Sequence, residues 1–508
     1  MKRALLAGTA FVCAMLAAAS ADANGYPRKG RAIDQLKPAA DYTDVMAGRP
    51  RALGIMRARA NGFVPSAALH DYVRSVQMRV LKGVNLPPSF QPDVRVLAAP
   101  EFTALCTPDG TIIVTIGLLE QLDNEDELAF ILGHETSHAI YRHHAHDWYQ
   151  KAQYYAVMSG SSFDQISDHV GYNIGGISTT QVLRTAEHVA KLSQNVFGPQ
   201  MDKDQEDAAD ALGFDLAVKA GYDSEASLGV MDKLAAQEAE SAAMAAKEKE
   251  EQKQEDEKET PEQNADDLLS GFGGGSSSGI AGLGMSLFNS AVDNMAEDNT
   301  QHHPATERAA LLSAYEFREY RSLLPANPTP LPWKGDSTDP KAREMASLLA
   351  HYSDAEDAAA YIAQAEAGQA SGAPPTTQSA VATSTQQPTT DHAYTEFVAS
   401  EYYDLNKNEA QSEAALLKAV QGPEPSWEVY SRLLNIYTKR NDWQKAENLM
   451  EQAVPRFDNS PVLLPKRIAI LHGLGRQQEA EALLPQCNGY DIKELYDFCK
   501  KAADGSGG

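Results

Sequence analysis

The sequence predicts an α+β fold, in which a mostly helical first domain with a small β-sheet is followed by an all-α domain of repeats. Residues 93–99 and 111–116 are short runs rich in β-branched residues, and Pro-Asp-Gly at 108–110 has the composition of a turn. Residues 124–144 have the apolar pattern of a buried helix. Towards the C-terminus, side chains recur with a constant period. We therefore expect a small antiparallel sheet, a helical core around it and a separate helical domain.

Residues 1–23 have the features of a bacterial secretory signal peptide. Two basic residues precede an apolar run at 4–19, and small residues ending at Ala21 or Ala23 offer a cleavage site. The apolar run is short for a stable membrane span, and Cys13 lies inside it rather than in a lipobox. We expect a soluble periplasmic protein without an integral membrane span.

The helix predicted at 124–144 begins with Asn124 as N-cap and carries the motif HETSH. Its two histidines, His134 and His138, are four residues apart, about one helical turn, so their imidazoles can share one metal ion. Glu135 lies beside the first histidine and can reach a metal-bound water without ligating the metal. This position makes Glu135 the predicted general base of a hydrolase.

Zinc needs a third protein ligand, and two candidates compete. His144 occupies the third-histidine position of the metzincin pattern, but Tyr141 stands where that pattern has a glycine, and a continuing helix would turn His144 away. The alternative is Glu206, in a second helical stretch at 205–223, where Asp210 follows on the same face. In this gluzincin arrangement Glu206 ligates and Asp210 accepts the outer N–H of a ligand histidine.

These residues predict a zinc-dependent peptidase with one Zn²⁺ per chain. The expected ligands are His134, His138 and Glu206, because an HExxH motif followed by an ExxxD pair is much more specific than either motif alone. His143 and His146 are expected to be solvated histidines at the end of the helix.

The motifs resemble gluzincin metallopeptidases of the HtpX and CAAX-prenyl-protease type, particularly their soluble periplasmic BepA-like branch with tetratricopeptide repeats. The similarity extends over residues 102–135, KAGYD at 219–223 and HPATER at 303–308, although Thr103 stands where the family commonly has Asn. It implies a zincin-type domain with an edge strand at residues 103–107 that holds the substrate backbone in extended form. Such pairing would favour unfolded substrates, because folded proteins have few free strand edges.

The same resemblance implies roles for His303 and Arg308. His303 would approach the metal, either as an additional ligand that restrains activity or as a group that helps at the reaction centre; a structural histidine is the alternative. Arg308 would orient substrate or stabilise the developing oxyanion. The implied setting is quality control of outer-membrane proteins, with the repeats docking on assembly machinery. A chaperone or adaptor with a silent or His303-blocked zinc site, and a peptidase that processes one precursor, are the rival hypotheses.

Changes in composition mark the expected domain limits. The peptidase domain is predicted in two parts, residues 24–235 and 300–367, separated by a polar and Gly-rich flexible insertion at 236–299. This insertion would be either a lid over the cleft or a surface loop. A linker at 368–391 precedes the repeat domain at 392–503.

The repeat domain has the tetratricopeptide period. Similar side chains recur every 34 residues: Glu413, Glu447 and Glu481, and Tyr403, Tyr437 and Leu471. Each unit would be a helix pair, and stacked pairs would form a concave surface for a peptide or partner protein; an irregular helical domain is the alternative.

The cysteines and the net charge limit the cellular compartments and partners that we expect. Cys487 and Cys499 are close in sequence and could pair in an oxidising periplasm, which leaves Cys106 as a buried small hydrophobe or a regulatory thiol. The formal net charge of −26, without a basic stripe, argues against nucleic acid and anionic membranes as partners. Unfolded or stalled proteins are the expected substrates.

Overall fold

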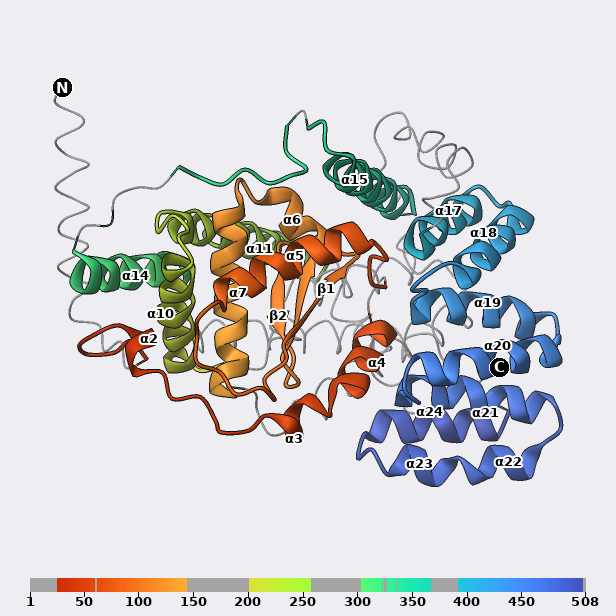
Figure 1. The fold of residues 1–508 in the computed structure, drawn as a ribbon. Helices are drawn as coiled ribbons and strands as arrows, with labels where there is room; N and C mark the ends of the chain where they lie inside the picture. The colour runs from red at the N-terminus through yellow and green to blue at the C-terminus, as the bar shows by residue number, and fades with distance from the viewer. Residues whose placement is uncertain are drawn as a thin grey trace. The chain divides into compact units, whose positions relative to one another are not determined.

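The computed structural model is mostly helical with one three-stranded sheet, as the predicted α+β class requires (Figure 1). It describes residues 25–59, 62–143, 201–256, 303–321, 323, 327–335, 337–366 and 392–505. The predicted signal peptide and linker, His144, His146 and residues 257–299 of the predicted insertion lie outside the described residues. Among the described helices, none combines the length and apolar composition that a membrane span requires.

The chain divides into two compact units, which we describe separately. Unit 1 comprises Met1–Lys37, Asn124–Ser137 and Thr185–Thr329, and unit 2 comprises Pro38–Asp123, His138–Arg184 and Pro330–Gly508. The division falls within helix α7 (Glu125–Tyr141). Because this helix is continuous, the residues on both sides of the division are placed by the same backbone.

Unit 1 is helical within the described residues. Besides most of α7, it contains α2 (Ala32–Gln35), α10 (Lys203–Lys219), α11 (Ala226–Asp256) and α14 (Ala305–Tyr320). Helix α10 begins with a capping box, in which Asp202 accepts from the backbone N–H of Gln205 and the Gln205 side chain accepts from that of Asp202. It packs against α2 and α14, and α11 packs against α14.

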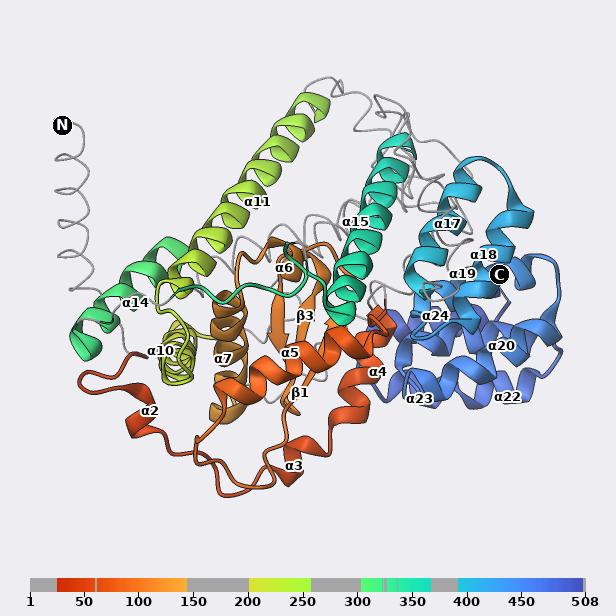
Figure 2. The same cartoon turned by 45° about the horizontal axis from the view of Figure 1, so that its top comes forward.

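Helix α11 corrects one predicted boundary. The flexible insertion was expected to begin at residue 236, but the helix continues without interruption to Asp256 (Figure 2). Its second half is rich in Ala, Glu, Lys and Gln, which are strong helix formers even where no apolar face is buried. High polarity therefore marked a helix here, and not a loop.

Unit 2 contains the sheet, with strands β1 (Asp93–Leu97), β2 (Ala104–Cys106) and β3 (Thr111–Thr115) in the order β1-β3-β2. Strand β2 pairs with β3 antiparallel, whereas β1 pairs with β3 in parallel, so the expectation of a purely antiparallel sheet is wrong. The segment Leu97–Thr103 carries the chain from β1 to β2 past the position of β3. The chain then returns along β3, which lies between the other two strands. Strand β2 lies at an edge, where the resemblance placed residues 103–107.

Unit 2 also contains helices that precede the repeat helices in the sequence. They are α3 (Thr43–Met46), α4 (Arg49–Arg59), α5 (Ala67–Val80), α6 (Ile116–Gln121) and α15 (Pro340–Glu366). Helix α5 packs against β1, α6 against β3, and α15 against both α5 and α6. Strand β3 is buried along its whole length, as its apolar sequence predicts.

The C-terminal part of unit 2 is all-α, as predicted. Its helices are α17 (Ala393–Leu405), α18 (Glu409–Gln421), α19 (Trp427–Lys439), α20 (Trp443–Arg456), α21 (Leu464–Gly473), α22 (Gln477–Ala482), α23 (Leu484–Asn488) and α24 (Lys493–Ala503). Consecutive helices from α17 to α22 pack on one another (Figure 1). The predicted pairing of Cys487 with Cys499 is confirmed, since a disulfide joins α23 to α24.

The 34-residue period coincides with the helix pairs. Tyr403, Tyr437 and Leu471 lie on α17, α19 and α21, and Glu413, Glu447 and Glu481 lie on α18, α20 and α22. Two of these glutamates make equivalent ion pairs with an arginine in the following helix pair. Glu413 pairs with Arg440, just after α19, at 2.6 Å, and Glu447 pairs with Arg476, just after α21. This regularity agrees with stacked repeats, and their identification as tetratricopeptide repeats stays a prediction.

The repeat helices are not a separate body, contrary to expectation, because α4 joins their core. Ala58 belongs to the same buried cluster as Trp427 and Leu433. Arg57 pairs with Glu424 at 2.9 Å. One turn before Ala58, a Cβ atom at Gly54 would lie 2.7 Å from Asp458 Cβ, so only glycine permits this approach. Small residues four positions apart thus form a flat helix face against the repeats.

Substituting Gly54 by Val should weaken this packing. The added side chain must displace the backbone near Asp458, which we expect to lower the free energy of unfolding by about 1–3 kcal/mol. Gly489→Ala is the matched control, because a Cβ there meets its nearest atoms at an ordinary 3.4 Å. Chemical denaturation of the full chain measures both variants. Equal stability of Gly54→Val and the parental chain would contradict the packing described.

Candidate metal centre

Three buried acidic side chains fix the start of α7, the helix that carries the HETSH motif. Asn124 caps the helix as predicted, accepting from the backbone N–H of Glu127 at 2.9 Å. Each acid has a partner within unit 1: Glu125 accepts from Tyr222 Oη at 3.0 Å, Asp126 from the backbone N–H groups of Asp223 and Thr329, and Glu127 from Lys233 Nζ at 2.9 Å. The KAGYD segment therefore holds α7 in place rather than entering the site.

Helices α7 and α10 approach each other so closely that their backbones touch. A Cβ atom at Gly213 would lie 2.6 Å from the backbone nitrogen of His134, and one at Gly133 would lie 2.9 Å from the carbonyl oxygen of Gly213. Either side chain would force the helices apart. This approach brings the carboxylates of the first turns of α10 to the histidine of α7.

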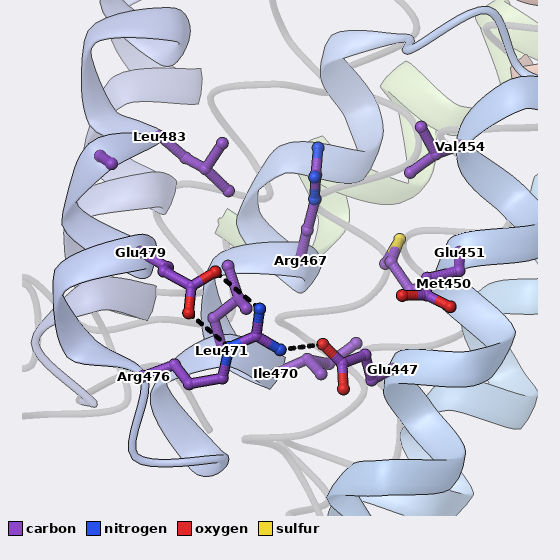
Figure 3. A pocket seen from close by; sticks show the side chains of 11 residues that line it. Glu447, Met450, Glu451, Val454, Arg467, Ile470, Leu471, Arg476, Glu479 and Leu483 are labelled. Carbon is purple, nitrogen blue, oxygen red and sulfur yellow. Dashed lines mark hydrogen bonds and ion pairs between the residues drawn. The ribbon is translucent and has the colours of Figure 1, made fainter.

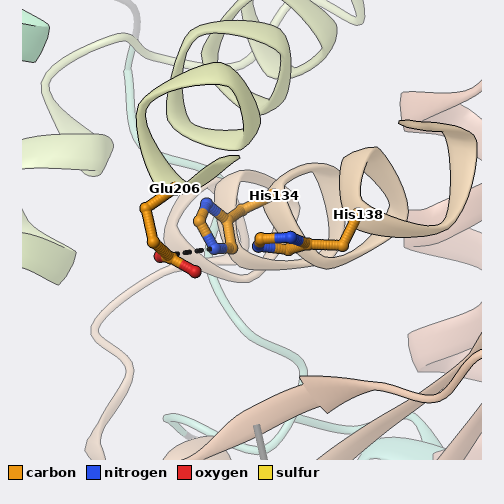
Figure 4. A group of neighbouring side chains, drawn as sticks. All are labelled: His134, His138 and Glu206. Atoms are coloured by element: carbon orange, nitrogen blue, oxygen red, sulfur yellow. Dashed lines mark ion pairs between the residues drawn. The ribbon is translucent and has the colours of Figure 1, made fainter. Parts of the chain in front are cut away.

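The predicted ligands converge. Potential ligand atoms of His134, His138 and Glu206 all lie within 4.8 Å of one another, and the side chains face one another from α7 and α10 (Figure 4). His134 Nε2 is 3.6 Å from Glu206 Oε2. Zinc–ligand bonds of about 2.0–2.2 Å place the ligand atoms of one tetrahedral ion roughly 3–4 Å apart. All three residues are buried, at 9%, 3% and 7% relative exposure. The donor set, together with the 3.6 Å separation of His134 and Glu206, therefore suits one zinc ion.

Asp210 lies against His134, the first predicted ligand. Its Oδ1 atom lies 2.9 Å from His134 Nδ1, which leaves Nε2 of that ring for the metal. Burial alone would raise the pKa of Asp210, but Arg308 and His134 outweigh burial and hold this pKa at about 2. Burial lowers the pKa of His134, yet the contact with Asp210 raises it overall. Asp210 is therefore an anion at neutral pH.

Arg308 contacts both carboxylates of α10. Its Nε and Nη2 atoms donate to Asp210 Oδ2 and Oδ1 at 2.9 and 2.7 Å, and Nη2 lies 3.3 Å from Glu206 Oε2. Burial would lower the pKa of Arg308, but the carboxylates raise it, so the guanidinium stays charged. In this arrangement Arg308 positions the ligand carboxylate and its neighbour. Its predicted role towards substrate or oxyanion stays a prediction.

The structure places His303 beside other acids. Its Nδ1 atom lies 3.1 Å from Glu307 Oε1, and Nε2 lies 3.8 Å from Asp207 Oδ2; it is not part of the metal-ligand group found among the described residues. Asp207, which the sequence analysis did not single out, is fully buried. Its burial raises its pKa to about 7, although His303 opposes this shift. The proposed approach of His303 to the metal stays a prediction.

Two other residues, Glu135 on α7 and His143 just after its end, lie next to the predicted histidine ligands. Glu135, the predicted general base, is half-buried on α7 next to His134. The expectation that His143 is solvated is wrong, because this side chain is half-buried and its Nδ1 atom lies 3.1 Å from His138 Nδ1. The helix was predicted to continue to residue 144, which would have turned His143 away from His138.

Removing the Arg308 guanidinium should destabilise unit 1 strongly. In Arg308→Met, two buried carboxylates lose their cation, and we expect the free energy of unfolding of the metal-free chain to fall by about 3–5 kcal/mol. Arg318→Met is the matched control on the same helix. The Arg318 side chain is 41% exposed, and loss of its contacts with Glu319 and the Pro27 carbonyl should cost about 1 kcal/mol. Denaturation at neutral pH measures the difference.

The pH dependence gives a second readout for this pair of variants. Because the folded-state pKa of Asp210 is depressed to about 2, its contribution to parental stability is present above about pH 4 and is lost as pH falls towards 2. This acid-range loss should be smaller in Arg308→Met and unchanged in Arg318→Met. If the stability of both variants depended on pH as that of the parental chain does, the assigned contact of Arg308 with Asp210 would be contradicted.

Comparison with known proteins agrees with the donor set. Residues 67–316, just under half of the chain, match the family model described as Peptidase family M48. The sequence is 28% identical over 142 residues, 26% of this chain, to "Metalloendopeptidase OMA1, mitochondrial" of Bos taurus. It is 41% identical over 51 residues, 10% of this chain, to "Mitochondrial metalloendopeptidase OMA1" of Arabidopsis thaliana. These matches span 24% and 10% of the lengths of the two relatives. Residues 67–316 are therefore similar to Peptidase family M48, and this similarity, together with the two relatives, supports a zinc metalloendopeptidase.

Proposed function

We propose that the chain is a zinc-dependent endopeptidase of the bacterial periplasm that hydrolyses peptide bonds in unfolded or misassembled proteins. The observation that carries the proposal is the buried convergence of His134, His138 and Glu206 from two helices. Asp210 and Arg308 support these ligands, as a metal site that must keep its geometry through catalysis requires.

Glu135 performs the proton transfers in the proposed mechanism. Zinc, when bound by His134, His138 and Glu206, would polarise the scissile carbonyl and lower the pKa of the attacking water. Glu135 accepts a proton as the water oxygen bonds to the carbonyl carbon. It then delivers that proton to the leaving nitrogen as the C–N bond breaks. Atoms and charge balance without a covalent enzyme intermediate.

The edge strand β2 supports unfolded chains as the substrate class. Its backbone pairs with β3 on one side, through Ala104 to Cys106, and it is last in the strand order of the described sheet. An extended substrate would add to such an edge by main-chain hydrogen bonds, which read backbone conformation more than sequence. The likeness of residues 102–135 to BepA-like peptidases extends this proposal to outer-membrane proteins.

The disulfide supports the proposed compartment. Cys487 and Cys499 are paired, and disulfides persist in the periplasm but are rare in the reducing cytosol. The signal-peptide features of residues 1–23 suggest the same location independently.

A cavity in the repeat helices supports a partner-binding role for that region. It has a volume of about 400 Å³ and lies among α20, α21 and α22 (Figure 3). Apolar side chains line it: Met450, Val454, Ile470, Leu471 and Leu483. Of its two arginines, Arg476 is paired with Glu447 and Glu479, whereas Arg467 has no carboxylate partner within the described residues. The apolar part of this lining suits a partner segment that inserts an apolar side chain.

Cleavage of an unfolded protein tests the activity. The parental chain should cleave a reduced, unfolded test protein, spare its folded form and lose activity with a chelator. Glu135→Gln should keep its zinc but lose about 10²–10⁴-fold in rate, because only the proton acceptor is removed. Glu479→Gln, at an exposed position in α22, is the matched control and should cleave at the parental rate.

Two outcomes would contradict this assignment. Cleavage by Glu135→Gln at the parental rate would show that another group is the base. Proteolysis that is absent in both the parental chain and His303→Ala would favour the chaperone or adaptor, in which the repeats act alone.

Cell fractionation tests the proposed compartment, and cross-linking tests the proposed substrates and partners. In a bacterial host the chain should be recovered in the periplasmic fraction, and removal of residues 2–23 should retain it in the cytosol. Glu135→Gln, which binds without cleaving, should cross-link to outer-membrane proteins, and Arg467→Ala should reduce recovery of assembly partners without changing cleavage of the test protein. Cytosolic recovery of the full chain, or one sharply cleaved precursor as the sole client, would overturn the proposed setting.

A further inference from the structure

We infer that His143 is a positioning residue for His138, which it orients through a hydrogen bond between the Nδ1 atoms of the two rings. The inference rests on the proposed zinc site and extends it to a side chain that no motif requires. The two Nδ1 atoms are 3.1 Å apart. At this distance one ring must donate and the other must accept, so the contact selects a tautomer for each ring.

The end of α7 is built to bring His143 back to His138. Arg142 has φ +56°, in the left-handed region, directly after the last helical residue. The backbone N–H of Arg142 donates to the carbonyl of Ala139, and that of His143 donates to the carbonyl of His138 at 3.0 Å. This is the Schellman pattern of helix termination. It reverses the chain direction, so that His143, the sixth residue of the turn, lies next to His138, the first.

Arg142 would not adopt this conformation without compensation, since a non-glycine residue in the left-handed region costs about 1–2 kcal/mol. Its guanidinium pairs with Asp44 at 3.1 Å, donates to the carbonyl of Asp41 and lies 4.8 Å from the centre of the Tyr42 ring. The Tyr42 hydroxyl donates to the carbonyl of Ile140 at 2.6 Å. The segment before α3 therefore fastens the turn that places His143.

Ring packing fixes the orientation of His143. Tyr141 stacks on it, with ring centres 5.1 Å apart and an angle of 18° between the planes. The His138 ring meets it edge-on, at 5.1 Å and 73°. The stack with Tyr141 restricts the plane of the His143 ring, and within that plane the Nδ1 atom faces Nδ1 of His138.

The tautomer follows from the demands of the metal. A neutral His138 that binds zinc through Nε2 carries its proton on Nδ1, which then donates to Nδ1 of His143. His143 in turn carries its proton on Nε2. Asp210 performs the corresponding task for His134 with a charged carboxylate. The two histidine ligands therefore have outer partners of different charge, and only one of them adds an anion to the site.

Zinc affinity of the full chain, measured by competition with a chelating dye, tests the inference. His143→Phe keeps the ring that stacks on Tyr141 but removes the nitrogen, and we expect about 10–100-fold weaker zinc binding. His143→Gln, whose amide oxygen can accept from His138, should restore part of the affinity. His472→Phe is the matched control, because it removes an imidazole that contacts Gln477 in the repeat helices and is outside the metal-ligand group, and its affinity should stay near the parental value.

The melting temperature of the metal-free proteins separates positioning from folding. If His143 acts only by orienting His138 for zinc, its replacement should leave this melting temperature nearly unchanged. Should His143→Phe fail to fold, His143→Leu replaces it in the comparison with His143→Gln. Parental zinc affinity in the Phe or Leu variant, or equal loss in the Gln variant, overturns the inference while the zinc site stands. A parental chain that binds no zinc overturns the site itself.

Discussion

The metal centre depends on the contact between the backbones of α7 and α10. Gly133 and Gly213 leave no side chain between the helices, so the first turn of α10 lies within reach of His134. A helix pair separated by ordinary side chains has its axes 8–10 Å apart, and short acidic side chains would then fall short of the histidine. The approach of the predicted metal ligands is therefore a consequence of helix packing, and it depends on Gly133, directly before the HETSH motif, and on Gly213 of α10.

This close approach creates an electrostatic cost that the fold compensates locally. Glu206 and Asp210 are both buried, and two adjacent anions in a protein interior repel each other strongly. Arg308 offsets that repulsion by contacting both, and a bound divalent cation would offset it further. The same logic does not apply to His138, whose outer partner His143 is an imidazole. The charge of the site is thus concentrated on the α10 side.

The sequence predicted those parts of the site that follow from local periodicity. His134 and His138, or Glu206 and Asp210, share a helix face whatever the tertiary structure, and the capping residue Asn124 is equally local. The contact of Arg308 with Asp210 joins residues 98 positions apart, which no spacing rule determines. The position of His143 depends on the left-handed conformation of Arg142, a residue whose type does not indicate it. The parallel pairing of β1 with β3 likewise depends on a crossover and not on strand composition.

The disulfide between α23 and α24 has a consequence for local opening of the helical stack. Helices that open locally expose their buried side chains and backbone. Cys487 and Cys499 join α23 and α24 covalently around a buried cluster that includes Ile468 and Leu495. In a compartment where proteases degrade locally unfolded chains, such a disulfide would extend the lifetime of the protein. It would do so without stiffening the surfaces that contact other proteins.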